Sequence, residues 1–105
     1  MPIQFIQCDY FPLGRLVATC GVQEAIPSAN VLAVLKRHAR CDWGELDDHD
    51  CGVNTDALEH GGRLFSKYTV KDVEGSNRDV YVITDGIEPG GHGAYSTTVL
   101  FPSEY

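Results

Sequence analysis

The stretch R-L-F-S-K-Y-T-V at residues 63–70 has the two-residue periodicity of a β-strand. Its even-numbered residues, from Leu64 to Val70, fall on one face of an extended strand, because successive side chains of a strand point to opposite sides. Two further segments rich in β-branched and aromatic residues follow at 79–84 (D-V-Y-V-I-T) and 96–101 (S-T-T-V-L-F). Three such segments in succession predict an antiparallel meander of three to four strands.

The residues before this meander have the periodicity of helices. Over residues 29–39, apolar side chains recur at positions i, i+1, i+4 and i+8 and form one buried stripe. Thr19 is a suitable N-cap for a short helix that follows it. Asp47 and Asp48 are N-cap candidates for a third helix that runs to about His60, where two glycines stop it.

Helices followed by strands predict an α+β fold in which two to three N-terminal helices pack on one face of the sheet. The helical part covers about residues 19–61, and the meander covers about residues 63–101. A chain of 105 residues buries one modest core, so we expect a single domain over residues 1–105. Residues 3–7 are a further short extended candidate.

The charge and hydropathy of the chain exclude several classes of function. The formal net charge is −7 and the sequence pI is about 4.8, which disfavours direct binding to nucleic acids and to anionic lipid. No apolar run approaches the roughly 20 residues of a membrane-spanning helix. The N-terminus also lacks the positive and long apolar regions of a signal peptide. We therefore expect a cytoplasmic protein with no membrane partner.

Acidic residues are concentrated in residues 41–60, which hold seven of the fifteen acids and no Lys or Arg. Two more acids lie in the Gly-rich loop that follows the second predicted strand. Clustered carboxylates attract a basic partner. The candidate partner-binding residues are Asp42, Glu45, Asp47, Asp48, Asp50, Asp56, Glu59, Asp85 and Glu88.

The acidic segment fits metal and catalytic templates poorly. A calcium-binding loop that started at Asp48 would have Val53 where the template requires Gly. An alternative is a metal- or thiol-dependent site made of His38, Cys41, His49 and Cys51. The spacings of these four residues differ from those of closed zinc sites, and neighbouring carboxylates oppose formation of a thiolate. We therefore predict no catalytic residue, no metal and no cofactor, and keep this site as the alternative.

Two other residues of the segment are expected to be structural. Trp43 precedes a glycine between two helices, where we expect it to fill the junction between helices and sheet. Asn54 is expected to tie its helix to a loop through side-chain hydrogen bonds.

Six sequence blocks in a fixed order also carry a resemblance. The blocks are T-C-G-V-Q-E-A-I (19–26), D-W-G-E-L-D (42–47), N-T-D-A-L (54–58), G-G-R-L-F-S-K-Y (61–68), V-Y-V-I-T (80–84) and S-T-T-V-L-F-P-S-E-Y (96–105). Over about residues 14–105 the chain resembles a family of small bacterial proteins on plasmids, prophages and integrated elements. Its members are often labelled plasmid-related or, misleadingly, a type I restriction subunit. The resemblance implies a mobile-element accessory protein and no particular activity. Residues 1–11 and the loop 87–95 depart from the family's pattern and are candidates for specialised contacts.

These observations lead to the hypothesis of a non-enzymatic interaction protein. It inhibits a host defence complex, as an anti-CRISPR or anti-restriction protein, by binding a basic protein surface such as the groove that normally holds nucleic acid. A third reading is a structural homo-oligomeric accessory protein, in which an exposed strand at residues 96–101 pairs with a second copy.

Overall fold

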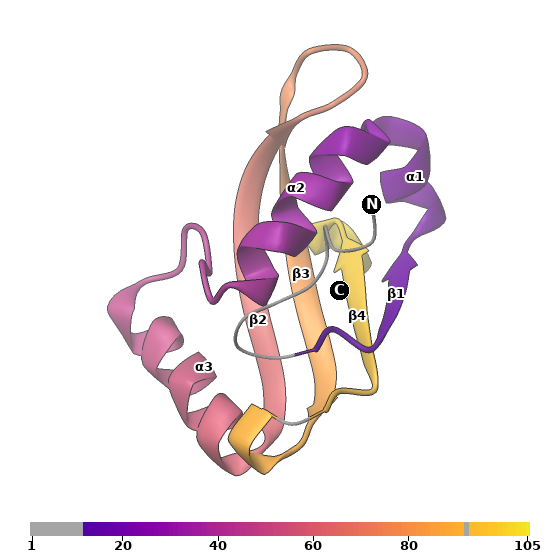
Figure 1. Cartoon of the computed structure of the whole chain (residues 1–105). Coiled ribbons are helices and arrows are strands. Elements are labelled where there is room, and N and C mark those ends of the chain that lie inside the picture. Colours follow the sequence, from indigo (N-terminus) through magenta and orange to yellow (C-terminus); the bar gives the residue numbers. More distant parts are fainter. Residues whose placement is uncertain (1–11, 92) are drawn as a thin grey trace.

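The computed structural model of the protein describes residues 12–91 and 93–105. Its elements in chain order are β1 (Arg15–Ala18), α1 (Cys20–Ala25), α2 (Ser28–Ala39), α3 (Asp48–His60), β2 (Gly62–Lys71), β3 (Asn77–Ile87), the short 3₁₀ turn η2 (Pro89–Gly91), β4 (Ser96–Leu100) and the 3₁₀ turn η3 (Pro102–Glu104). The class is α+β, as the sequence predicts (Figure 1). The candidate strand at residues 3–7 lies outside the described residues.

The sheet is mixed, which corrects the prediction of a purely antiparallel meander. Its strand order is β1-β4-β3-β2, with β2–β3 and β3–β4 antiparallel and β1 parallel to β4. In the parallel pair Leu16 lies opposite Thr97. Because β1 precedes the helices, these are not N-terminal to the whole sheet. Local alternation predicts that a segment is extended, but it does not reveal a pairing across some 80 residues of chain.

This strand order also removes the pairing edge that the homo-oligomer hypothesis requires. β4 lies between β1 and β3, so its backbone pairs on both sides within the chain. A second copy therefore has no free edge at residues 96–100.

The helices occupy two different places on the sheet, whereas the sequence predicts one layer. α1 and α2 cover one face, and α3 lies beside the outer edge of β2 (Figure 1). The side chain of Asn54 in α3 donates to the backbone oxygen of Phe65 at 2.7 Å and accepts from its backbone nitrogen at 3.0 Å. Asn54 therefore ties its helix to a strand edge rather than to a loop, and in doing so covers that edge.

The core lies between α1, α2 and the sheet. On α2 the buried residues are Val34, Leu35, His38 and Ala39. Val31 and Leu32, the first apolar residues of the predicted stripe, are only half-buried. The even-numbered face of β2 supplies Leu64, Ser66 and Tyr68 to this core. None of the helices in the described part of the chain is long and apolar enough to cross a membrane.

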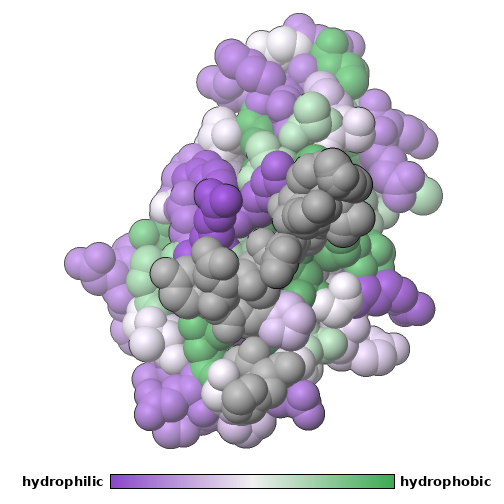
Figure 2. Space-filling model, viewed as in Figure 1, coloured by the Kyte–Doolittle hydropathy of each residue, from purple (hydrophilic) through white to green (hydrophobic). Residues whose placement is uncertain are grey.

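Figure 2 views the face that α1 and α2 cover, in the same orientation as Figure 1. Hydrophilic residues gather at the far end of the β2–β3 hairpin and at the opposite end of the molecule, where α3 meets the start of β2. On β1, Leu16 is 43% exposed and Val17 is 39% exposed. All seven acids of residues 41–60 are exposed at the surface.

Candidate functional site

Residues 42–47, here called the corner, connect α2 to α3 and contain three acids with partners inside the chain. α2 ends at a left-handed residue, Cys41, with φ of 65°. The backbone nitrogens of Cys41 and Asp42 then donate to the carbonyl oxygens of His38 at 3.0 Å and Arg37 at 2.9 Å. This paired closure is a common way to end a helix, and it gives Cys41 a structural position.

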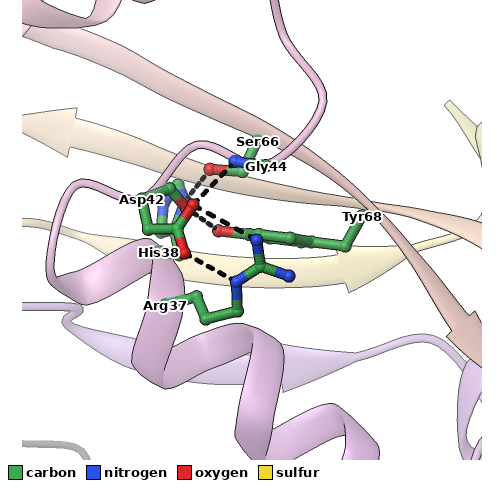
Figure 3. Close-up of polar contacts among 6 residues, drawn as sticks. All are labelled: Arg37, His38, Asp42, Gly44, Ser66 and Tyr68. Atoms are coloured by element: carbon green, nitrogen blue, oxygen red, sulfur yellow. Dashed lines mark hydrogen bonds and ion pairs between the residues drawn. The ribbon is translucent and has the colours of Figure 1, made fainter.

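Asp42 is bound on two sides (Figure 3). The Arg37 guanidinium donates to its carboxylate at 2.7 and 3.3 Å, and the backbone nitrogen of Gly44 donates to it at 3.2 Å. The hydrogen bond from Arg37 lowers the pKa of the Asp42 carboxyl below its ordinary value. The Arg37 guanidinium also stacks over the Tyr68 ring, 4.7 Å from its centre. Asp42 is therefore engaged within the fold.

Trp43 and Gly44 hold the corner against β2. Trp43 is only 8% exposed and its ring meets the His38 ring edge-on, with centres 5.5 Å apart, so the prediction of a buried Trp is confirmed. The Trp43 carbonyl oxygen accepts from the backbone nitrogen of Lys67 at 3.2 Å. The backbone nitrogen of Glu45 donates to the carbonyl oxygen of Lys67 at 2.8 Å. The corner thus adds one strand-like bridge to the β2 edge.

Two more predicted site residues in the corner stabilise the fold. The Glu45 carboxylate accepts from the Thr69 hydroxyl at 2.6 Å. The Asp47 carboxylate accepts from the Asp50 nitrogen at 2.8 Å and is the N-cap of α3, as the sequence predicts. Outside the corner, Asp85 accepts from Arg63 at 2.8 Å. These carboxylates already have partners within the chain.

Three acids of α3 differ from those of the corner. Asp48, Asp56 and Glu59 are exposed and form no side-chain hydrogen bond or ion pair with another described residue. They are spaced i, i+8 and i+11, which places them along one side of the helix. That side faces away from Asn54 and Ala57, the two residues that α3 buries. We call these three residues the acidic stripe.

The two remaining predicted residues lie apart from this stripe. Asp50 is exposed on a different side of α3, next to the apolar Val53. Glu88 is exposed in the loop between β3 and β4. The nine predicted residues therefore do not form one face. Among the described residues, Asp48, Asp56 and Glu59 share one side of α3 and have no side-chain partner.

A buried chain of hydroxyls and one imidazole crosses the core, and the sequence reasoning missed it. Ser66 Oγ lies 2.6 Å from His38 Nδ1, and His38 Nε2 lies 2.8 Å from Thr84 Oγ1. Thr84 Oγ1 lies 2.7 Å from Thr97 Oγ1, which donates to the Leu13 oxygen at 2.6 Å. All four side chains are fully buried.

The hydrogen bond from Thr97 to the Leu13 oxygen determines which atom is the donor in every other bond of this buried network. Thr97 gives its only hydroxyl proton to a carbonyl, so it accepts from Thr84, and Thr84 accepts from the Nε2–H of His38. Ser66 then donates to an unprotonated Nδ1. Burial lowers the pKa of His38 to about 3, which agrees with a neutral ring.

A serine beside a histidine suggests nucleophilic catalysis, and a histidine suggests a metal ligand, but the geometry favours neither. Ser66 and His38 have the spacing of a nucleophile and its base, but both are 0% exposed, so a substrate cannot reach them. Both nitrogens of His38 are occupied by hydroxyls, and His49 lies exposed on α3. In residues 12–91 and 93–105, no three His, Cys, Asp or Glu side chains are grouped to hold a metal ion. The geometry therefore does not favour the Cys/His alternative.

A sequence signal for the buried chain did exist. Ser66 falls on the apolar face of residues 63–70, between Leu64 and Tyr68. A polar residue on a core-facing position needs a buried partner, and a histidine in the last turn of the neighbouring helix supplies it.

Comparisons with known proteins do not assign this site. No protein-family model matches the chain, and searches of curated proteins and of solved structures find no match.

Proposed function

We propose that the protein is a small acidic binding protein that attaches to a basic protein surface through α3, and that it thereby inhibits a host defence complex of the CRISPR or restriction type. One observation carries the binding role: the acidic stripe Asp48, Asp56 and Glu59 has no partner among the described residues, whereas the corner acids do. Carboxylates that do not stabilise the fold remain available to a partner.

The physical basis is long-range attraction followed by charge pairing. With a net charge of −7, the molecule attracts Arg- and Lys-rich surfaces, and an unpaired stripe orients the encounter. Salt screens exposed charges over a Debye length of about 8–10 Å near physiological ionic strength. Binding should therefore weaken as salt is added.

The choice of a defence complex as target rests on context. Resemblance to proteins of plasmids and prophages supports a role that helps a mobile element to survive in its host. Defence complexes hold nucleic acid in basic grooves, which suit an acidic inhibitor. The burial of Ser66 and His38 supports binding rather than hydrolysis.

A plasmid-transformation assay tests the proposal directly. Cells with an active CRISPR or restriction system receive a targeted plasmid, with or without expression of the protein. We expect expression to raise transformation efficiency, and Asp56→Asn together with Glu59→Gln to reduce that gain at least ten-fold.

The control variant is Glu24→Gln with Glu74→Gln, which changes the net charge equally at two exposed acids outside α3. It should keep the gain. No gain with wild-type protein in either system, or an equal loss in both variants, would contradict the proposal.

A further inference from the structure

The face of the sheet opposite α2 carries a hollow of about 400 Å³ beside α3. Its walls include Leu46, Asp50, Val53, Phe65, Tyr81 and Tyr105. A volume of this size is typical of sites that enclose a small molecule or a large side chain. We call this hollow the aromatic groove.

The alternation of β2 explains why aromatic rings gather here. Ser66 and Tyr68 point toward α2, so Phe65 points to the other face. There its ring meets the Tyr81 ring of β3 edge-on, with centres 4.6 Å apart. The Tyr105 ring lies 6.0 Å from that of Tyr81 and completes an aromatic floor.

The walls of the groove are mostly apolar and remain in contact with water, and the polar side chains of Asn54 and Arg63 also line it. α3 directs Asn54 and Ala57 toward the β2 edge, and this leaves Val53 at the rim with 52% of its surface exposed. Tyr105 is 69% exposed. Exposed apolar surface in a concave place is typical of an interaction site.

The charges at the groove favour a basic occupant. Arg63 donates to Asp85 at 2.8 Å and to the Tyr105 hydroxyl at 3.1 Å, so its charge is paired within the chain. Asp50 on the rim has no partner among the described residues. The acidic stripe lies on the other side of this helix, so the unpaired negative charge at the groove itself is the Asp50 carboxylate.

We propose that the aromatic groove receives an aromatic side chain of a basic protein segment, whose flanking Arg or Lys residues face Asp50. Aromatic side chains pair edge-on with aromatic floors and dominate the binding energy of many interfaces. This inference rests on the proposed function and adds the place and the anchor of the partner.

Three short peptides probe the groove in ¹⁵N-labelled full-length protein by NMR titration. The first has tryptophan flanked by two arginines on each side, the second has alanine in place of tryptophan, and the third has tryptophan flanked by glutamates. We expect the first to shift the backbone signals of Val53, Phe65 and Tyr81 in a saturable way, at least ten-fold more tightly than the other two.

Two matched variants locate the effect. Val53→Gln removes apolar surface from the rim and should weaken the first peptide at least five-fold. Val73→Gln makes the same change at a residue that is 63% exposed in the turn after β2, and should have no effect. Asp50→Asn should weaken binding and reduce its dependence on salt.

The outcomes separate this inference from the proposed function. Equal, salt-sensitive binding of both arginine peptides at α3, without shifts at Phe65 and Tyr81, would overturn the groove and leave the acidic stripe supported. Equal binding of both tryptophan peptides would overturn the basic partner. No saturable shift from any peptide at millimolar concentration would overturn both the groove and the proposed role of α3.

Discussion

The corner at residues 42–47 and the outer side of α3 are adjacent and equally acidic, yet their carboxylates differ in what they contact. In the corner, Asp42 binds Arg37, Glu45 binds Thr69, and Asp47 caps a helix. On α3, Asp48, Asp56 and Glu59 contact no described partner through their side chains.

Local acidity therefore does not identify a binding surface. An acid that holds a turn cannot be exchanged without a cost to folding, whereas an unpaired acid can be exchanged with little cost. Substitutions in the corner should therefore change the free energy of unfolding more than matched substitutions on the outer side of α3.

The largest effect is expected at Gly44 in the corner. Its φ is 75°, and a Cβ there would overlap the Lys67 carbonyl oxygen and lie 2.7 Å from a Tyr68 ring carbon. Gly44→Ala should lower the free energy of unfolding by about 3–5 kcal/mol, because both the backbone conformation and the contact are unfavourable. Urea denaturation followed by circular dichroism measures this change.

Gly52 in α3 is the matched control for Gly44. It lies within a helix, and a Cβ there meets no atom within 4 Å. Gly52→Ala should raise the free energy of unfolding by about 0.5–1 kcal/mol, because alanine loses less backbone entropy than glycine. If both variants lost stability equally, the distinction between the two regions would fail.

The next effect concerns acid stability and His38, which packs against Trp43 of the corner. The pKa of His38 is lowered from 6.5 to about 3 in the folded protein, so the unfolded chain binds the proton first. The contribution of His38 to the free energy of unfolding is therefore fully present well above pH 6.5. It decreases by up to about 1.4 kcal/mol per pH unit as the pH falls from 6.5 toward 3.

Denaturation between pH 7 and pH 4.5 checks this slope. The window is suited to His38, because the pKa of the Asp42 carboxyl is lowered from 3.8 and its contribution is lost only at lower pH. His38→Gln should be less stable at pH 7 but should show a flatter pH dependence. An unchanged slope in this variant would refute the assignment to His38.

A smaller effect is expected where α3 contacts the sheet. Asn54→Ala removes two hydrogen bonds to the backbone of Phe65 at a site that is 2% exposed, and should cost about 2–3 kcal/mol. Thr55→Ala removes one exposed hydrogen bond within α3 and should cost less than about 0.5 kcal/mol. The free energies of unfolding of the two variants give the comparison.

The smallest effects compare the acids themselves. Asp42→Asn weakens an ion pair whose two side chains are each 49% exposed, so we expect a loss of no more than about 1 kcal/mol. Asp56→Asn with Glu59→Gln should change stability by less than about 0.5 kcal/mol. A larger loss in the α3 variant than in Asp42→Asn would show that the stripe has a structural role.

Much of the fold could be predicted from local sequence patterns. The cap at Thr19, the cap at Asp47 and the stop at Gly61 are read from neighbouring residues, and the structure confirms all three. Alternation in β2 also identified which of its side chains share a face. The parallel pairing of β1 and the edge position of α3 could not be predicted, because both depend on contacts between residues distant in sequence.

The candidate site was predictable to a smaller extent. Sequence located the acidic segment and the burial of Trp43, but it did not separate carboxylates with partners from those without. Arg37 and Thr69, which bind Asp42 and Glu45, precede or follow the segment in other elements. The aromatic groove also combines residues from α3, β2, β3 and the C-terminal end, so no single stretch reveals it.

The class of the fold, the ends of the helices and the place where negative charge accumulates follow from the properties of neighbouring residues, so they can be derived without a structure. Which acids remain available depends on the folded chain, since a carboxylate is engaged or unpaired according to the groups that folding brings beside it. The same applies to His38: its sequence neighbours suggest a metal ligand, and the two hydroxyls that the sheet presents keep it neutral and buried.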